Sequence, residues 1–129
     1  MSSENVGKQG NTGLKRIIKA TGYSIQGLKA AWKHEAAIRQ EVALLLVALP
    51  IIVLVDVTLV EKILMLSGLL ILIAIELVNS AIEAIVDRVG VEHHELSGRA
   101  KDIGSAAVMV MLLLNAINWA LILGNRYVF

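Results

Sequence analysis

A cluster of polar side chains follows directly after a long apolar run in the middle of the chain. Residues 63–75 are apolar except for Ser67 and Gly68, and a segment rich in carboxylates comes next. On a helix, the polar positions of that segment fall at i, i+3, i+4, i+7 and i+11, so they share one face. These residues are Glu76, Asn79, Ser80, Glu83 and Asp87.

The chemistry of this face follows from the cost of placing charge in an apolar chain. A charged side chain inside a bilayer costs about 2.5–3.5 kcal/mol, so such residues face a protein interior or a wet cavity and are functional candidates. Glu76 lies about 10 Å deeper than Glu83 at 1.5 Å per residue, which suits a general base that removes a hydroxyl proton. Glu83, nearer to water, suits a metal ligand.

Glu35 is a candidate partner for Glu83 in a metal site. It is the only acid between Glu4 and Glu41, and it precedes the first long apolar run. An ion pair with a neighbouring Lys or Arg is the alternative role for this side chain.

The segment at residues 87–102 is dense in charge and contains two glycines. Its carboxylates close to Arg99 and Lys101 suit a metal-bound polyphosphate, because Mg²⁺ takes hard oxygen ligands while the cations neutralise phosphoryl charge. A solvated loop is the alternative interpretation. His93 and His94 are adjacent and therefore point to different sides of a helix or strand, which disfavours a zinc site.

The composition places these residues in an integral membrane protein. The chain has 129 residues, of which 57% are hydrophobic and 4% aromatic, and the mean hydropathy is +0.72. A net charge of +1 gives no sign of nucleic-acid binding, and the absence of cysteine excludes disulfides and thiolate chemistry. We expect one domain with no cleavable signal peptide.

Hydropathy and periodicity predict an all-α membrane protein. Apolar residues at helical spacing with basic flanks predict an interfacial amphipathic helix over residues 14–39, with a soluble helix as the alternative. Asn115 and Asn118 are expected to form hydrogen bonds between helices, with substrate binding as the alternative role. The small residues 104–107 suit close packing. The predicted segments are a disordered tail (1–12), the surface helix (14–39), three transmembrane helices (42–60, 63–86 and 103–123) and a loop (87–102).

The distribution of basic residues predicts the orientation in the membrane. Seven Lys or Arg residues precede the first span, one lies in the first connection, three lie in the second and one follows the third span. The positive-inside rule then makes the N-terminus and the second connecting loop cytoplasmic.

The segment at residues 76–87 resembles the signature of the bacterial integral-membrane (prokaryotic-type) diacylglycerol kinase family. The similarity continues through residues 94–107, covers 16–20, 22–24 and 30–41, and spans residues 14–124 in all. The resemblance implies a homotrimeric bundle in the bacterial inner membrane, each chain with a surface helix and three transmembrane helices. It also implies transfer of the ATP γ-phosphate to the hydroxyl of diacylglycerol, with Mg²⁺, to give phosphatidic acid.

The resemblance also implies roles for individual residues. Glu76 would be the catalytic base, supported by Asn79, while Glu35 and Glu83 would hold Mg²⁺. The implied nucleotide contacts are Arg16, Tyr23, Glu35, Glu83, Glu92, His93, His94, Lys101 and Asp102. The implied lipid contacts are Ala20, Thr21, Gly22, Tyr23, Ser24, Ile25, Lys29, Ala30, Ala31, Trp32, Ala37, Ile38, Arg39, Gln40, Glu41, Glu76 and Ser105.

Three other functions remain open from the sequence. Undecaprenol kinase shares the family signature, although residues 31–41 look more like the diacylglycerol enzymes. A small cation transporter would use the intramembrane acids, but residues 63–75 offer no continuous polar path. A structural or regulatory membrane subunit would not depend on Glu76.

Overall fold

The computed structural model describes residues 12–90, 92 and 94–129. The predicted tail, residues 1–12, therefore lies outside the described residues except for Thr12. The chain divides into two compact units, residues 1–34 and residues 35–129. The described part of the chain is helical, in the order α1, α2, α3 and α4.

The first unit contains one helix, α1 (Gly13–His34). Two hydroxyls on it donate hydrogen bonds back to the carbonyl oxygen four residues earlier, Thr21 to Ile17 at 2.8 Å and Ser24 to Ala20 at 3.0 Å. The helix ends five residues before the end of the predicted surface helix at Arg39. The reason is Glu35, whose backbone is extended (φ −117°, ψ 107°) and forms the N-cap of the next helix.

The second unit consists of α2 (Ala36–Leu54), α3 (Leu59–Val89) and α4 (Glu95–Tyr127). All three are long and apolar enough to cross a membrane. At 1.5 Å per residue, α2 is about 28 Å long, α3 about 46 Å and α4 about 50 Å. The hydrocarbon core of a bilayer is about 30 Å thick, so α3 and α4 are longer than a perpendicular crossing requires.

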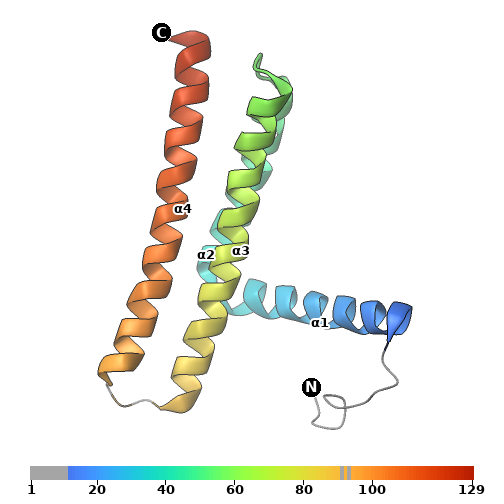
Figure 1. Cartoon of the computed structure of the whole chain (residues 1–129), viewed down its shortest axis with the longest axis vertical. Helices are drawn as coiled ribbons and strands as arrows, with labels where there is room; N and C mark the ends of the chain where they lie inside the picture. Colours follow the sequence, from blue (N-terminus) through green and yellow to red (C-terminus); the bar gives the residue numbers. More distant parts are fainter. Residues whose placement is uncertain (1–11, 91, 93) are drawn as a thin grey trace. The chain divides into compact units, whose positions relative to one another are not determined.

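The helices α3 and α4 run antiparallel and side by side (Figure 1), and α3 also packs against α2. Both helices extend beyond the predicted spans 63–86 and 103–123. Much of the segment predicted as a loop over residues 87–102 is therefore helical. Hydropathy marks the apolar part of a helix, whereas the backbone hydrogen bonds here continue into its charged ends.

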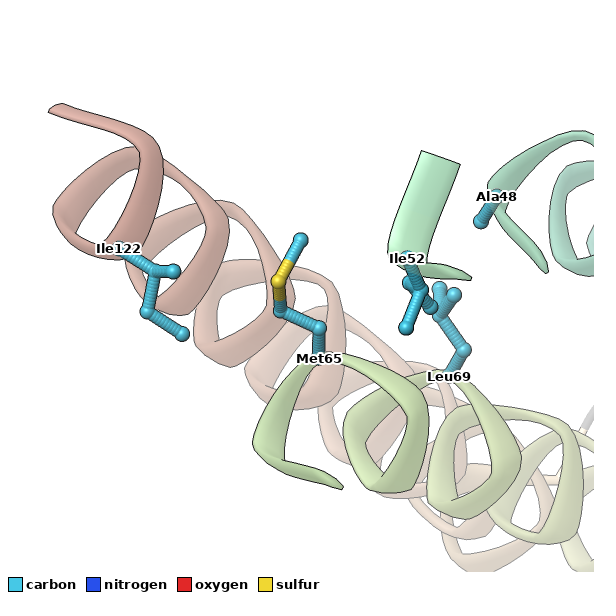
Figure 2. Packing of buried hydrophobic residues seen from close by; sticks show 5 residues of the cluster. All are labelled: Ala48, Ile52, Met65, Leu69 and Ile122. Carbon is cyan, nitrogen blue, oxygen red and sulfur yellow. The ribbon is translucent and has the colours of Figure 1, made fainter. Parts of the chain in front are cut away.

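The apolar core joins all three helices near the connection between α2 and α3. It consists of Ala48 and Ile52 from α2, Met65 and Leu69 from α3, and Ile122 from α4 (Figure 2). Met65 is fully buried. The start of α3 is fixed by a capping box, in which Glu61 N donates to Thr58 Oγ1 at 3.1 Å and Thr58 N donates to Glu61 Oε1 at 3.0 Å.

Charged side chains also connect the helices at the end of the second unit where α2 and α3 are joined. Arg126 of α4 pairs with Asp56, which lies between α2 and α3, at 2.5 Å. Its Nε also donates to the main-chain oxygen of Asp56 at 2.9 Å. Lys62 donates to the oxygen of Val53 at 2.8 Å. The C-terminus of α4 is thus tied to the turn after α2.

Candidate functional site

The polar face of α3 is buried at Glu76, Asn79 and Ser80 and becomes exposed toward Asp87. Glu76, Asn79 and Ser80 have exposed fractions of 6%, 6% and 8%, and Glu83, one turn further, is half-buried. Side chains at i, i+3, i+4 and i+7 lie on one face, and the packing of α3 in the unit covers that face. Buried polar groups of this kind require partners or a functional role.

Asn79 orients one of the carboxylates directly. Its Nδ2 donates a hydrogen bond to Glu83 Oε1 at 3.2 Å. The other amide atom, Asn79 Oδ1, is buried and has no hydrogen-bond partner, and neither has the hydroxyl of Ser80. The side chain of Asn79 is therefore held by one hydrogen bond and by packing.

Two further carboxylates gather around Glu76 from α2 and its N-cap. Glu35 and Glu83 both interact electrostatically with Glu76, and so does Glu41 of α2. The Glu35 side chain makes no capping hydrogen bond to the start of α2. One oxygen of Glu41 is buried without a hydrogen-bond partner. Glu83 and Glu35, the carboxylates that the sequence singled out for metal binding, are thus within electrostatic range of Glu76. Their roles in catalysis and metal binding stay predictions.

This arrangement fits Mg²⁺ better than a metal that needs a full set of protein ligands. Among residues 12–90, 92 and 94–129, no three His, Cys, Asp or Glu side chains converge closely enough to hold a metal ion alone. Mg²⁺ is commonly bound by one or two carboxylates, while water and substrate phosphates complete its octahedron. Glu83, oriented by Asn79, and Glu35 offer oxygen donors of that kind.

A cavity of about 390 Å³ lies where α3 meets α4. Its lining residues are Val86, Asp87, Gly90, Glu92, His94, Ser97, Gly98 and Lys101. Three residues predicted to contact nucleotide, Glu92, His94 and Lys101, therefore share one cavity. The Nζ of Lys101 lies 2.6 Å from Asp87 Oδ1, so the cavity contains both a cation and an anion.

The remaining polar residues in and around this cavity make other contacts. His94 caps α4, because its Nδ1 accepts a hydrogen bond from Leu96 N at 3.1 Å. Arg99 pairs with Glu95 at 3.5 Å and does not line the cavity. Asp102 is exposed, and His93 lies outside the described residues.

The predicted lipid contacts fall on separate elements. The predicted lipid contacts at residues 20–25 and 29–32 lie on α1. The predicted nucleotide contacts Arg16 and Tyr23 lie on the same helix. They are seven residues apart and therefore share one side of it. The predicted lipid contacts at residues 37–41 lie on α2, where Ile38 is 3% exposed. Ser105 is exposed on α4. Their roles stay predictions.

Spacing along a single helix did not reveal one feature of the site. Gly104 of α4 faces Asn79, and a methyl group at Gly104 would overlap Asn79 Oδ1. The run of small residues at 104–107 predicted close packing of the third span. It did not indicate which residue of the neighbouring helix lies there.

Comparison with known proteins identifies the family. The family model described as prokaryotic diacylglycerol kinase matches residues 22–123. A diacylglycerol kinase of Pseudomonas aeruginosa is 52% identical over 115 residues, which are 89% of this chain and 94% of that protein. Those of Escherichia coli K12 and Haemophilus influenzae are 49% and 50% identical, over 90% and 87% of this chain and 95% of each relative. The chain belongs to the prokaryotic diacylglycerol kinase family.

Proposed function

We propose that this protein transfers the γ-phosphate of ATP to the hydroxyl of diacylglycerol and so forms phosphatidic acid. The observation that carries the proposal is the group of carboxylates around the buried Glu76, with Glu83 oriented by Asn79. The similar proteins of Escherichia coli and Pseudomonas aeruginosa are diacylglycerol kinases, which supplies the substrate class.

In this proposal Glu76 acts as the general base. It accepts the proton of the lipid hydroxyl as the hydroxyl oxygen bonds to the γ-phosphorus of ATP. The bond from that phosphorus to the β,γ-bridging oxygen breaks, and ADP leaves with that oxygen. Positioning and electrostatic stabilisation account for the rate increase, and no phosphoenzyme forms.

Glu35 and Glu83 would hold Mg²⁺ together with the phosphates of ATP. The bound ion would neutralise charge on the transferred phosphoryl group. Asn79 contributes by keeping the Glu83 carboxylate in one orientation through its 3.2 Å hydrogen bond. A carboxylate that is already oriented loses less conformational entropy when it binds a metal.

The cavity between α3 and α4 is the proposed position of the nucleotide. Lys101 supplies a cation for the phosphates, and Glu92 and His94 supply polar contacts. Asp87 holds the Lys101 ammonium at 2.6 Å and keeps it oriented while the site is empty of phosphate. Arg16 and Tyr23 of α1, His93 and Asp102 complete the proposed nucleotide contacts.

The proposed setting is the bacterial inner membrane, with the N-terminus and the α3–α4 connection in the cytoplasm. The basic residues before α2 and after α3 support this orientation. The lipid hydroxyl would then reach Glu76 from the membrane interface. The residues proposed to contact the lipid are 20–25 and 29–32 of α1, 37–41 of α2, and Ser105. The proposed assembly is a homotrimer.

The decisive experiment measures phosphate transfer from radiolabelled ATP with Mg²⁺ in mixed micelles. Diacylglycerol and undecaprenol are offered separately to the wild type and to Glu76→Gln. Glu61→Gln is the matched control, because Glu61 lies on the same helix α3 but caps its opposite end. We expect labelled phosphatidic acid from the wild type and from Glu61→Gln, and a loss of about a hundredfold to ten-thousandfold in Glu76→Gln.

The other outcomes contradict separate parts of the proposal. Label only in the polyprenol would keep the mechanism and change the substrate. Equal activity of Glu76→Gln and the wild type would exclude Glu76 as the base. A folded protein that labels neither lipid would contradict the kinase proposal, and ion flux in proteoliposomes would then favour a transporter.

Mixed trimers test whether protomers share a site. Glu76→Gln chains lack the base, and Lys101→Ala chains lack the cation of the nucleotide cavity. If one site draws these groups from two protomers, mixing the two impaired proteins at subsaturating ATP gives more activity than the two proteins give separately. No recovery in mixed trimers would show that each chain must supply both groups.

A further inference from the structure

Two glycine–asparagine contacts join α3 and α4. On α4, Gly104 faces Asn79 so closely that an added methyl group would overlap Asn79 Oδ1, and on α3, a methyl group at Gly68 would lie 2.5 Å from Asn115 Oδ1. The glycine and the asparagine are eleven residues apart on each helix, about three turns. Because the helices are antiparallel, each glycine accommodates the asparagine of the other helix.

The two contacts differ in what the asparagine amide binds. Asn115 Nδ2 donates to two main-chain oxygens, that of Gly68 at 3.0 Å and that of Met111 at 2.9 Å. Asn79 Nδ2 donates instead to the side chain of Glu83. The contact of Gly104 with Asn79 is therefore the one of the two that bears on a carboxylate of the candidate site.

We propose that Gly104 is a positioning residue for phosphoryl transfer. Because it has no side chain, the Asn79 amide can lie against α4, and that amide in turn orients Glu83. Asn79 Oδ1 has no hydrogen-bond partner. If packing moves the side chain, no hydrogen bond to that atom holds it in its original orientation. This inference rests on the roles proposed above for Asn79 and Glu83.

The expected effect of a methyl group at position 104 follows from this geometry. Either Asn79 rotates away from α4 or the two helices separate, because well-packed interiors do not accept an added carbon without a shift. A rotation of Asn79 takes its amide away from Glu83, and a separation of the helices removes the packing that holds this amide in place. A displacement of about 1 Å at a reacting centre can cost about a hundredfold in rate.

The test compares Gly104→Ala with Gly68→Ala, which introduces the same methyl group at the matching contact remote from the carboxylates. We expect Gly104→Ala to lower kcat at least tenfold and to raise the Mg²⁺ concentration needed for half-maximal activity. We expect Gly68→Ala to lower the thermal midpoint of unfolding while kcat stays within threefold of the wild type. Asn79→Ala and Glu83→Gln are measured in parallel.

A thermodynamic cycle keeps the proposal testable if Gly104→Ala folds poorly. Removing the Asn79 side chain makes room for the new methyl group, so Gly104→Ala should lower the thermal midpoint much less in the Asn79→Ala background. An equal loss in both backgrounds would overturn the proposal, because something other than Asn79 would then exclude the methyl group.

The activities of the variants show whether the role of Gly104 alone is wrong or whether the proposed site as a whole is wrong. If Asn79→Ala and Glu83→Gln lose activity but Gly104→Ala keeps kcat and its Mg²⁺ dependence within twofold, Gly104 has no positioning role. If Asn79→Ala and Glu83→Gln themselves stay active, the proposed site is wrong and the role of Gly104 falls with it.

Discussion

The side chain of Asn115 on α4 donates a hydrogen bond to the main-chain oxygen of Gly68 on α3 at 3.0 Å. The two residues are far apart in the sequence, and both are buried. The bond confirms for Asn115 the expectation that this asparagine links helices. It also places a polar side chain in a largely apolar interface, where its removal has a measurable cost.

We predict a small loss of stability for Asn115→Ala. Hydrogen bonds between membrane helices contribute about 0.6 kcal/mol on average and at most about 1.7 kcal/mol. Because Asn115 Oδ1 is buried without a partner, its removal offsets part of that loss, so we expect a cost below about 1 kcal/mol. Unfolding in detergent micelles measures this loss of stability. A loss of several kcal/mol would contradict the prediction.

Lys101→Ala should weaken ATP binding selectively. Because Lys101 lines the proposed nucleotide cavity, loss of its ammonium should raise the KM for ATP by roughly tenfold. Arg99→Ala is the matched control, because Arg99 is on the same helix but pairs with Glu95 outside the cavity. We expect its KM to stay within threefold of the wild type. Similar increases in both variants would point to general electrostatic attraction of ATP.

The Asp56–Arg126 pair should make stability depend on acid pH. The hydrogen bond and the charge of Arg126 hold the pKa of Asp56 below its ordinary value of 3.8. The unfolded state therefore binds the proton first as the pH falls. The stabilisation is complete above the ordinary pKa and disappears as the pH drops through the lower folded-state pKa.

Asp56→Asn tests this dependence. We expect it to lower the thermal midpoint at pH 7 and to have no effect at a pH well below 3.8. In an Arg126→Gln background, Asp56→Asn should change the midpoint much less at pH 7. A difference between wild type and Asp56→Asn that persists unchanged into strong acid would contradict this assignment.

Thr58→Ala should destabilise the start of α3. Loss of an N-cap side chain costs about 1 kcal/mol, and here it removes one half of the capping box with Glu61. Ser67→Ala on the same helix is the control, since its hydroxyl only donates back to the oxygen of Ile63 at 2.6 Å. Such back-bonding contributes little to helix stability. In chemical or thermal unfolding, Thr58→Ala should be clearly less stable than Ser67→Ala.

The sequence predicts the apolar spans well and the helix ends poorly. The apolar run at residues 63–75 lies within α3. It is part of the longer predicted span 63–86, which is long enough to cross a bilayer. The end of α3 at Val89 is hidden because the charged turn that follows Val86 is helical too. Likewise, residues 33–37 contain neither glycine nor proline. The local sequence therefore does not predict the extended backbone at Glu35.

For the candidate site, the sequence predicts relations within one helix but not contacts between helices. Spacing within one helix is enough to align Glu76, Asn79 and Glu83, since helical geometry fixes which residues share a face. Contacts between helices are a different matter. The pairing of Asp87 with Lys101 and the approach of Gly104 to Asn79 depend on the register of α3 against α4, which no periodicity within either helix specifies.

The unequal lengths of the three helices have a consequence for hydrophobic mismatch. With its length of about 28 Å, α2 matches a hydrocarbon layer of about 30 Å, whereas α3 and α4 continue past it at the end that carries the carboxylates. A thicker bilayer is accommodated by changes in tilt or by local thinning of the lipid. We therefore expect acyl-chain length of the surrounding lipid to alter the depth of Glu76 below the headgroups, and with it the rate at which a membrane-borne hydroxyl meets the base.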